Sequence, residues 1–202
     1  MMNRRSFCIS STSIAAAIAL AARAESAEGA TPKKDVKAAK SVSIPMDEGK
    51  AGSIFEAYRK HAAERAALGI PPLPLNPEQV TALVFFLRTP PKGEEGFLME
   101  LLSDRVPPGV DESARIKADF LGGVASGKDK SPLISRQKAT ELLGTMLGGY
   151  NVRILISLLG DPAVGSAAAE SLKKTILVFN AIKDVQALVA KGNANAKAVL
   201  KS

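Results

Sequence analysis

Apolar residues recur at helical spacing along most of the chain from residue 53 onward. In the first such segment, 53–69, Phe55, Tyr58 and Ala62 fall on one face, because residues three, four and seven positions apart share one side of an α-helix. Comparable stripes occur at 77–88, 94–105, 111–124, 135–147, 151–159, 161–179 and 184–192, and a short helix is expected after them. No segment shows sustained alternation of polar and apolar residues, so the pattern predicts an all-α chain.

Capping residues and turns rich in Pro and Gly separate these segments. Ser53 and Glu56 have the spacing of a capping box, which predicts that the first helix begins there. Asn76 followed by Pro77 predicts a second helix start, because proline at the first helical position removes an N–H that would be unpaired anyway. Three later helices are expected to be capped by Asp111, Ser135 and Asp184.

The short connections between these helices predict antiparallel neighbours. Each helix pair has one apolar stripe that it cannot bury alone, whereas stacked pairs share a continuous core, so we expect a HEAT-like α-solenoid of about eight antiparallel helices. Strict sequence periodicity is absent, which leaves an irregular helical bundle as the alternative. Composition favours helices in both cases, because the chain has no Trp and two Tyr and its apolar share of 46% is largely Ala and Leu.

The first 24 residues have the three parts of an export signal. The residues that identify it are Arg4, Arg5, Phe7, Ala22 and Ala24. The two arginines precede an uncharged stretch that is shorter than the roughly 20 residues needed to span a bilayer, as in twin-arginine signals. We expect residues 1–24 to be removed and the chain to reach a thylakoid lumen or a bacterial periplasm. The mitochondrion is the alternative, because transit peptides are also rich in Arg and Ser.

The mature chain divides into a linker and a domain. Residues 25–52 contain no aromatic side chain and few large aliphatic ones, so they are expected to form a flexible linker before a domain at 53–202. The formal charge of +7 includes three arginines of the signal, which leaves +4 on the mature chain. The basic residues alternate with acidic ones along the helices. This arrangement is typical of solvated faces and argues against a nucleic-acid partner.

Few residues of the mature chain are suited to catalysis. The only cysteine, Cys8, lies in the signal, so no disulfide, metal–thiolate site or iron–sulfur cluster can form after its removal. His61 is the sole histidine and stands among charged residues, which is typical of a surface side chain. Acidic pairs at 94–95 and 111–112 fall at helix starts, where they complement the helix dipole. We therefore expect no catalytic residue, cofactor, metal or small-molecule substrate.

Three runs of the domain resemble the aconitase B family. They are EAYRKHAAERA at 56–66, RVPPGVDE at 105–112 and ELLGTMLGGYN at 141–151, and the similarity extends over nearly all of 53–202. The resemblance implies the HEAT-like helical domain that precedes the swivel and catalytic domains and is associated with protein–protein contacts, dimer formation and a tunnel towards the active site. Aconitase chemistry also needs a four-iron cluster held by three cysteines. We therefore expect no hydratase activity from this chain alone.

Two of these runs contain the candidate interaction residues, because Pro and Gly fix the backbone while Arg and Tyr are frequent interface anchors. The candidates are Arg105, Pro107, Pro108, Gly109, Asp111, Gly148, Gly149, Tyr150 and Asn151. We expect a non-catalytic interaction or scaffold subunit of a larger assembly, such as a peripheral lumenal subunit of a photosynthetic membrane complex, with a homodimer as a further option. The alternatives are an accessory or split fragment of an aconitase, serving dimerisation or substrate channelling, and more weakly an RNA-binding module.

Overall fold

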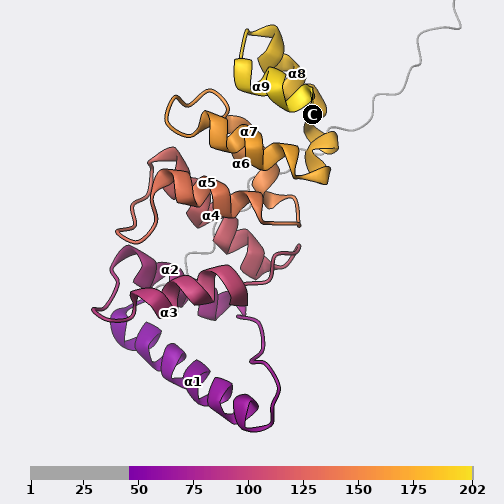
Figure 1. The fold of residues 1–202 in the computed structure, drawn as a ribbon. Helices are drawn as coiled ribbons and strands as arrows, with labels where there is room; N and C mark the ends of the chain where they lie inside the picture. Colours follow the sequence, from indigo (N-terminus) through magenta and orange to yellow (C-terminus); the bar gives the residue numbers. More distant parts are fainter. Residues whose placement is uncertain (1–45, 202) are drawn as a thin grey trace, which may run out of the picture. The chain divides into compact units, whose positions relative to one another are not determined.

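The computed structural model describes residues 46–201, which belong to one compact unit. All regular structure within them is helical (Figure 1). The α-helices are α1 (Glu48–Ala67), α2 (Pro77–Arg88), α3 (Glu95–Glu100), α4 (Glu112–Ser126), α5 (Arg136–Gly144), α6 (Tyr150–Leu158), α7 (Gly165–Lys173), α8 (Ile182–Ala190) and α9 (Ala194–Leu200). Two further segments are the π-helix η1 (Leu101–Arg105) and the 3-10 helix η2 (Ile176–Ala181). The prediction of helices without strands is therefore confirmed for the described residues.

The first helix begins earlier than the sequence predicted. Asp47 precedes α1, and its side chain accepts a hydrogen bond from the Lys50 backbone N–H at 2.8 Å. Ser53 lies inside α1, where its hydroxyl donates to the Lys50 carbonyl oxygen, so the predicted helix start at Ser53 is wrong. Aspartate caps a helix as well as serine does, and Asp47 comes first along the chain. Residues 48–52 thus belong to α1 rather than to the predicted linker.

Later helix starts follow the predictions in part. Asn76 caps α2 through a complete capping box, and the Ser135 side chain accepts a backbone N–H of α5, so both predictions are confirmed. Asp111 occupies the N-cap position of α4 but makes no side-chain capping bond. Asp184 lies in the first turn of α8 and does not precede it. That predicted cap is wrong because η2 runs directly into α8.

The segment predicted as one helix at 161–179 is divided. α7 ends at Lys173 because Thr175 adopts an extended backbone, with φ −99° and ψ 105°, and its hydroxyl donates to a carbonyl oxygen of α7 at 2.9 Å. Most residues of 175–179 are β-branched or aromatic, which lowers the cost of leaving the α-helix. In η2, which follows, Ile176 and Phe179 are exposed. The prediction of a single helix is therefore wrong beyond Lys173.

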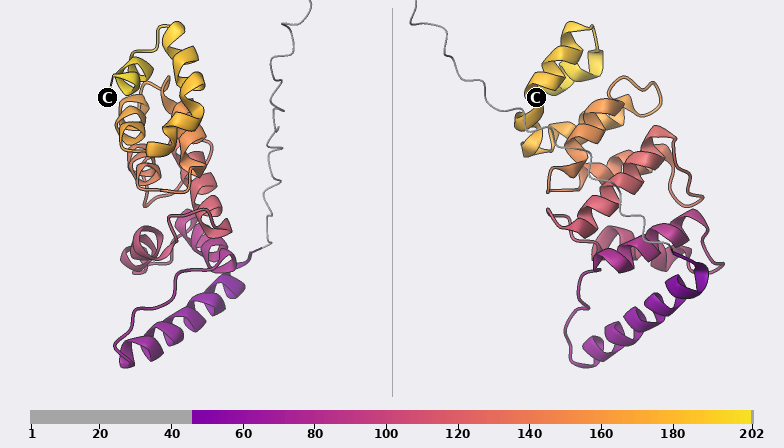
Figure 2. Two further views of the ribbon diagram at one scale, coloured as in Figure 1. Left: turned by 90° about the vertical axis from the view of Figure 1, so that its right-hand side faces the viewer. Right: turned by 180° about the vertical axis from the view of Figure 1, so that it is seen from behind.

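Consecutive helices form antiparallel hairpins that stack on one another. The hairpins are α2–α3, α4–α5, α6–α7 and α8–α9, with α1 packed against α2. α4 contacts both α2 and α6, and α7 contacts both α5 and α9, so helices of one hairpin pack on their counterparts in the next. Seen from the side, they stand in two columns (Figure 2). This arrangement confirms a HEAT-like stack instead of an irregular bundle.

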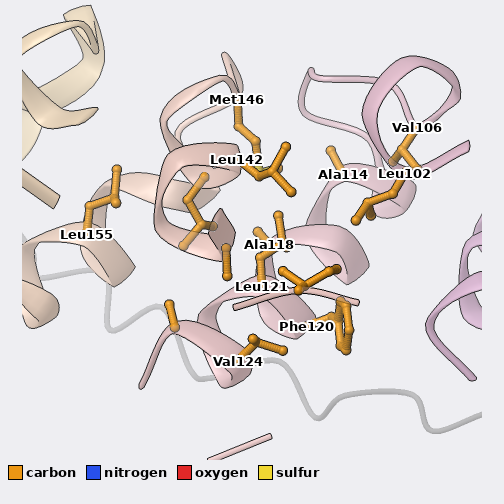
Figure 3. Packing of buried hydrophobic residues seen from close by; sticks show 14 of the residues in the cluster. Leu102, Val106, Ala114, Ala118, Phe120, Leu121, Val124, Leu142, Met146 and Leu155 are labelled. Atoms are coloured by element: carbon orange, nitrogen blue, oxygen red, sulfur yellow. The ribbon is translucent and has the colours of Figure 1, made fainter. Parts of the chain in front are cut away.

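One apolar core runs through the stack and joins buried side chains of successive hairpins. Figure 3 shows Ala114, Ala118 and Leu121 of α4 at its centre. Val106 lies on one side of them and Met146 on the other, and all five side chains are buried. Because interiors of this kind are close-packed, the core fixes the hairpins, and with them the loops at their ends.

The two kinds of connection lie on opposite edges of the stack. Connections within hairpins are on the left in Figure 1, and connections that lead from one hairpin to the next are on the right. The second set consists of 68–76, 106–111, 145–149 and 174–181. We call it the inter-hairpin edge. The chain leaves each hairpin at the end where it entered, which brings segments far apart in sequence to this one edge.

Candidate interaction site

The two predicted loops meet on the inter-hairpin edge. The backbone N–H groups of Leu147 and Gly148 both donate to the Pro108 carbonyl oxygen, at 2.9 and 3.1 Å. The Tyr150 hydroxyl donates to the Val110 carbonyl oxygen at 2.8 Å. Three hydrogen bonds therefore join the connections 106–111 and 145–149, together with the first residue of α6, although α4 and α5 separate them in sequence.

Two glycines allow this close approach. A Cβ atom on Gly148 would lie 1.8 Å from the Gly109 carbonyl oxygen, so a larger residue cannot fit without moving a loop. Gly149 has a φ of 84°, a left-handed conformation that glycine adopts without strain. A Cβ atom there would also lie 3.2 Å from the side chain of Leu177 in η2. Both predicted glycines thus serve the packing of one connection on the next.

The other predicted residues differ in exposure. Exposed or half-buried are Arg105, Pro107, Pro108, Gly109 and Asp111. Tyr150 is 36% exposed, with its hydroxyl already bonded. Asn151 is fully buried, and its amide donates to the carbonyl oxygens of Leu143 and Met146 at 2.7 and 3.2 Å. Asn151 therefore supports the loop from inside and presents no surface to a partner.

The connection at 68–76 is tied to the two helical segments on either side of 106–111. The Leu75 backbone N–H donates to the Arg105 carbonyl oxygen at 2.9 Å, and the buried Ser113 hydroxyl donates to the Leu75 carbonyl oxygen at 2.9 Å. His61 Nε2 accepts the backbone N–H of Leu73 at 3.3 Å, which gives the lone histidine a structural partner. These bonds anchor the connection 68–76 to α1, η1 and α4.

Nine large apolar side chains are exposed between residues 46 and 201, and seven of them lie in the connections of the inter-hairpin edge, all but Tyr150 and Leu200. These side chains are Leu68, Ile70, Leu73, Val110, Leu147, Tyr150, Ile176, Phe179 and Leu200. Leu200 ends α9, whose C-terminus reaches this edge (Figure 1). The sequence-based selection missed Val110 and Leu147, although each stands beside a predicted Gly or Asp. The sequence signal that could have identified Val110 and Leu147 is an apolar residue inside a turn, outside the apolar face of any predicted helix.

One charged cluster lies beside the two central loops. Arg115 of α4 forms a hydrogen-bonded ion pair with Glu112, and it lies 3.4 Å from a carboxylate oxygen of Asp119. The hydrogen bond between Arg115 and Glu112 lowers the pKa of Glu112 and raises the pKa of Arg115. Burial raises the pKa of Asp119, while Arg115 opposes that shift. Arg115 is thus engaged by two carboxylates of its own helix.

The predicted signal residues Arg4, Arg5, Phe7, Ala22 and Ala24 lie outside the described residues. Between residues 46 and 201, no three His, Cys, Asp or Glu side chains are arranged to hold a metal ion. In the same range, no helix is both long and apolar enough to span a membrane.

Stacked helical hairpins with two joined loops along one edge define a helical-repeat domain of the HEAT-like class. A family model described as the aconitate B N-terminal domain matches residues 57–202. The chain belongs to this family, which confirms the resemblance seen in the sequence.

Curated relatives agree with this assignment and are much longer than the matched region. Aconitate hydratase B of Pseudomonas aeruginosa is 55% identical over 149 residues, which is 74% of this chain and 17% of that protein. The Escherichia coli protein of the same name is 52% identical over 149 residues, with the same shares. That of Synechocystis is 57% identical over 134 residues, 65% of this chain and 15% of the relative. The chain thus spans less than a fifth of the length of these relatives.

Proposed function

We propose that the mature chain is a non-catalytic protein–protein interaction module that docks on a larger assembly through its inter-hairpin edge. The observation that carries this proposal is that seven of the nine exposed large apolar side chains of residues 46–201 lie in the connections of that edge. Exposed apolar side chains that gather on one part of a soluble protein mark interaction sites. Family membership supports a role without catalysis, because the matched region is only the N-terminal domain of the hydratases.

The centre of the edge is suited to binding because it is already ordered. Three hydrogen bonds and two glycine contacts fix the loops, so a partner need not order them and little conformational entropy is lost on docking. Val110 and Leu147 are 74% and 71% exposed on these adjoining loops. Burying such a side chain completely contributes about 1.5–3 kcal/mol. The pair therefore supplies an apolar anchor beside the ring of Tyr150.

Removing the two central apolar side chains tests this proposal. A chain with Val110→Ser and Leu147→Ser should lose the proteins that co-purify with the wild-type chain from its native compartment. The matched control carries Lys92→Ser and Lys130→Ser, at two exposed positions in connections within hairpins. Both chains should keep their helical circular dichroism, because all four side chains are exposed. Equal retention of the same partners by both double variants would overturn the proposal.

A second function is favoured because the chain covers only a small part of each curated relative. More than four fifths of each hydratase lies outside the matched region. We propose as the alternative that the same edge docks on a separate polypeptide that supplies cluster chemistry, which would make the chain an accessory part of an aconitase. Co-purification with an iron–sulfur polypeptide that turns over isocitrate supports this alternative. A partner set without such a polypeptide favours the scaffold role.

We also propose that the chain is exported after folding, on the strength of Arg4, Arg5 and the uncharged stretch that follows them. In a thylakoid lumen the assembly would be a photosynthetic membrane complex. N-terminal sequencing of the mature protein tests this proposal. Glu25 as the first residue supports export, and an intact N-terminus in a cytosolic fraction contradicts it.

A further inference from the structure

The 3-10 helix η2 sorts its side chains into columns. With three residues per turn, residues three positions apart lie one above the other. Val178 and Ala181 form a buried column, and η2 packs against α6, α7 and α8. Ile176 and Phe179 form an outward column, and they are 81% and 72% exposed. Two large apolar side chains therefore project together from a segment that its buried neighbours hold in place.

Two lysines stand on either side of η2 in the sequence. Lys174 and Lys183 flank η2, and neither ammonium group forms an ion pair within residues 46–201. Between residues 165 and 201 the chain contains six lysines, no arginine and two carboxylates. This part of the chain therefore carries a net positive charge.

The acidic groups near η2 have cationic neighbours of their own. Glu170 of α7 pairs with Lys173 at 2.6 Å. Asp184 of α8 lines a groove together with Arg153 and Lys191. Glu141, which borders the same groove as Lys174, lies 3.9 Å from Lys138. Within residues 46–201 the two lysines that flank η2 are thus left without an acidic partner.

This chemistry fits an anionic membrane surface better than a protein partner. Protein interfaces are depleted in Lys and enriched in Arg, but the two cationic residues that flank η2 in the sequence are both Lys. Segments that lie in a membrane interface instead combine Lys with Phe and large aliphatic residues. The long Lys side chain reaches the headgroups while neighbouring apolar groups enter the acyl boundary. A projecting apolar column is also readily accepted by a deformable bilayer.

We propose that η2 is a peripheral membrane contact, in which Ile176 and Phe179 enter the interface of a bilayer containing anionic lipids and Lys174 and Lys183 lie at the headgroups. The contact lies next to the protein-docking centre around Val110 and Leu147, because the side chain of Leu177 in η2 borders Gly149. One edge of the domain would therefore hold a protein partner and a membrane surface at the same time.

A tryptophan at position 179 reports on this contact. The chain has no Trp, so the emission of Phe179→Trp in the full chain comes from that site alone. Vesicles of phosphatidylcholine with phosphatidylglycerol should shift the emission to shorter wavelength, and added salt should reverse the shift, because the attraction between Lys and lipid is screened. Vesicle binding by the N-terminal segment alone would leave this emission unchanged. The matched control is Leu147→Trp, at an equally exposed position on the same edge, where no shift is expected.

Three substitutions separate the apolar and the charge contributions. Ile176→Ser in the Phe179→Trp background should weaken vesicle binding about tenfold or more, because a large apolar side chain no longer enters the interface. Lys174→Gln and Lys183→Gln should each weaken it about fivefold. Circular dichroism checks that every variant keeps its helices.

Several outcomes would overturn the proposal. One is an emission at position 179 that does not respond to anionic vesicles, and another is an equal response to pure phosphatidylcholine. A shift that appears only when a protein partner is added would assign η2 to protein docking. A shift that depends on protein concentration without vesicles would assign it to a second copy of the chain.

Discussion

Replacing Gly148 by alanine tests whether the contact between the two central loops stabilises the stack. The added Cβ atom would lie 1.8 Å from the Gly109 carbonyl oxygen and 2.4 Å from its carbonyl carbon. Neither atom belongs to a flexible side chain, so one loop must move by more than an ångström. That movement separates the donors Leu147 N and Gly148 N from the Pro108 carbonyl oxygen.

The size of the effect follows from the bonds that are lost. Two backbone hydrogen bonds and the Tyr150–Val110 bond each contribute about 0.5–1.5 kcal/mol. We expect Gly148→Ala to lower the free energy of unfolding by about 2–3 kcal/mol. For a domain of this size that corresponds to a fall in Tm of about 4–12 °C.

Urea denaturation followed by circular dichroism measures the change. The matched control is Gly52→Ala in α1, where an added Cβ atom meets nothing within 4 Å. This substitution should leave stability unchanged or raise it by about 0.5–1 kcal/mol, because alanine favours the helix. A Gly148→Ala chain that unfolds at the same urea concentration as the wild type would refute the proposed contact between the loops.

Two further predictions concern buried polar groups. Burial lowers the pKa of Lys117 to about 8, and its ammonium donates to the Leu102 carbonyl oxygen at 2.6 Å. Folding therefore favours the neutral amine, and the free energy of unfolding should rise by about 1–2 kcal/mol from pH ~8 to ~9.5. Urea titrations at the two pH values measure this rise, and Lys117→Met should abolish it. Asn151→Ala should cost about 2 kcal/mol through its two lost hydrogen bonds. Asn151→Asp should cost more at neutral pH in the same assay, because a carboxylate cannot donate to the carbonyl oxygens of Leu143 and Met146.

Local patterns were sufficient to predict most helices. Asn76 with Pro77 and Ser135 marked helix starts correctly, because capping depends on residues within one turn. The errors arose where two local signals competed. Asp47 caps α1 ahead of Ser53, and the extended Thr175 interrupts a stripe that reads as continuous helix in the sequence. The π-helical turn η1 left no signal in the apolar spacing.

The residues of the candidate site could be predicted in part. Pro and Gly marked the two loops, but their contact depends on the stacking of α4 and α5 between them, which no local pattern contains. For the same reason the burial of Asn151 was missed, because a polar residue next to a turn normally faces solvent. Val110 and Leu147 are likewise exposed because their loops lie at the edge of the stack, and no local pattern shows where that edge is.

Hydrogen–deuterium exchange of the chain with and without a co-purified partner tests the proposed docking surface most directly. We expect slower exchange on binding in the connections 68–76, 106–111 and 145–149, with little change elsewhere. Protection confined to the connections within hairpins, at 127–135 and 159–164, would contradict docking through the inter-hairpin edge.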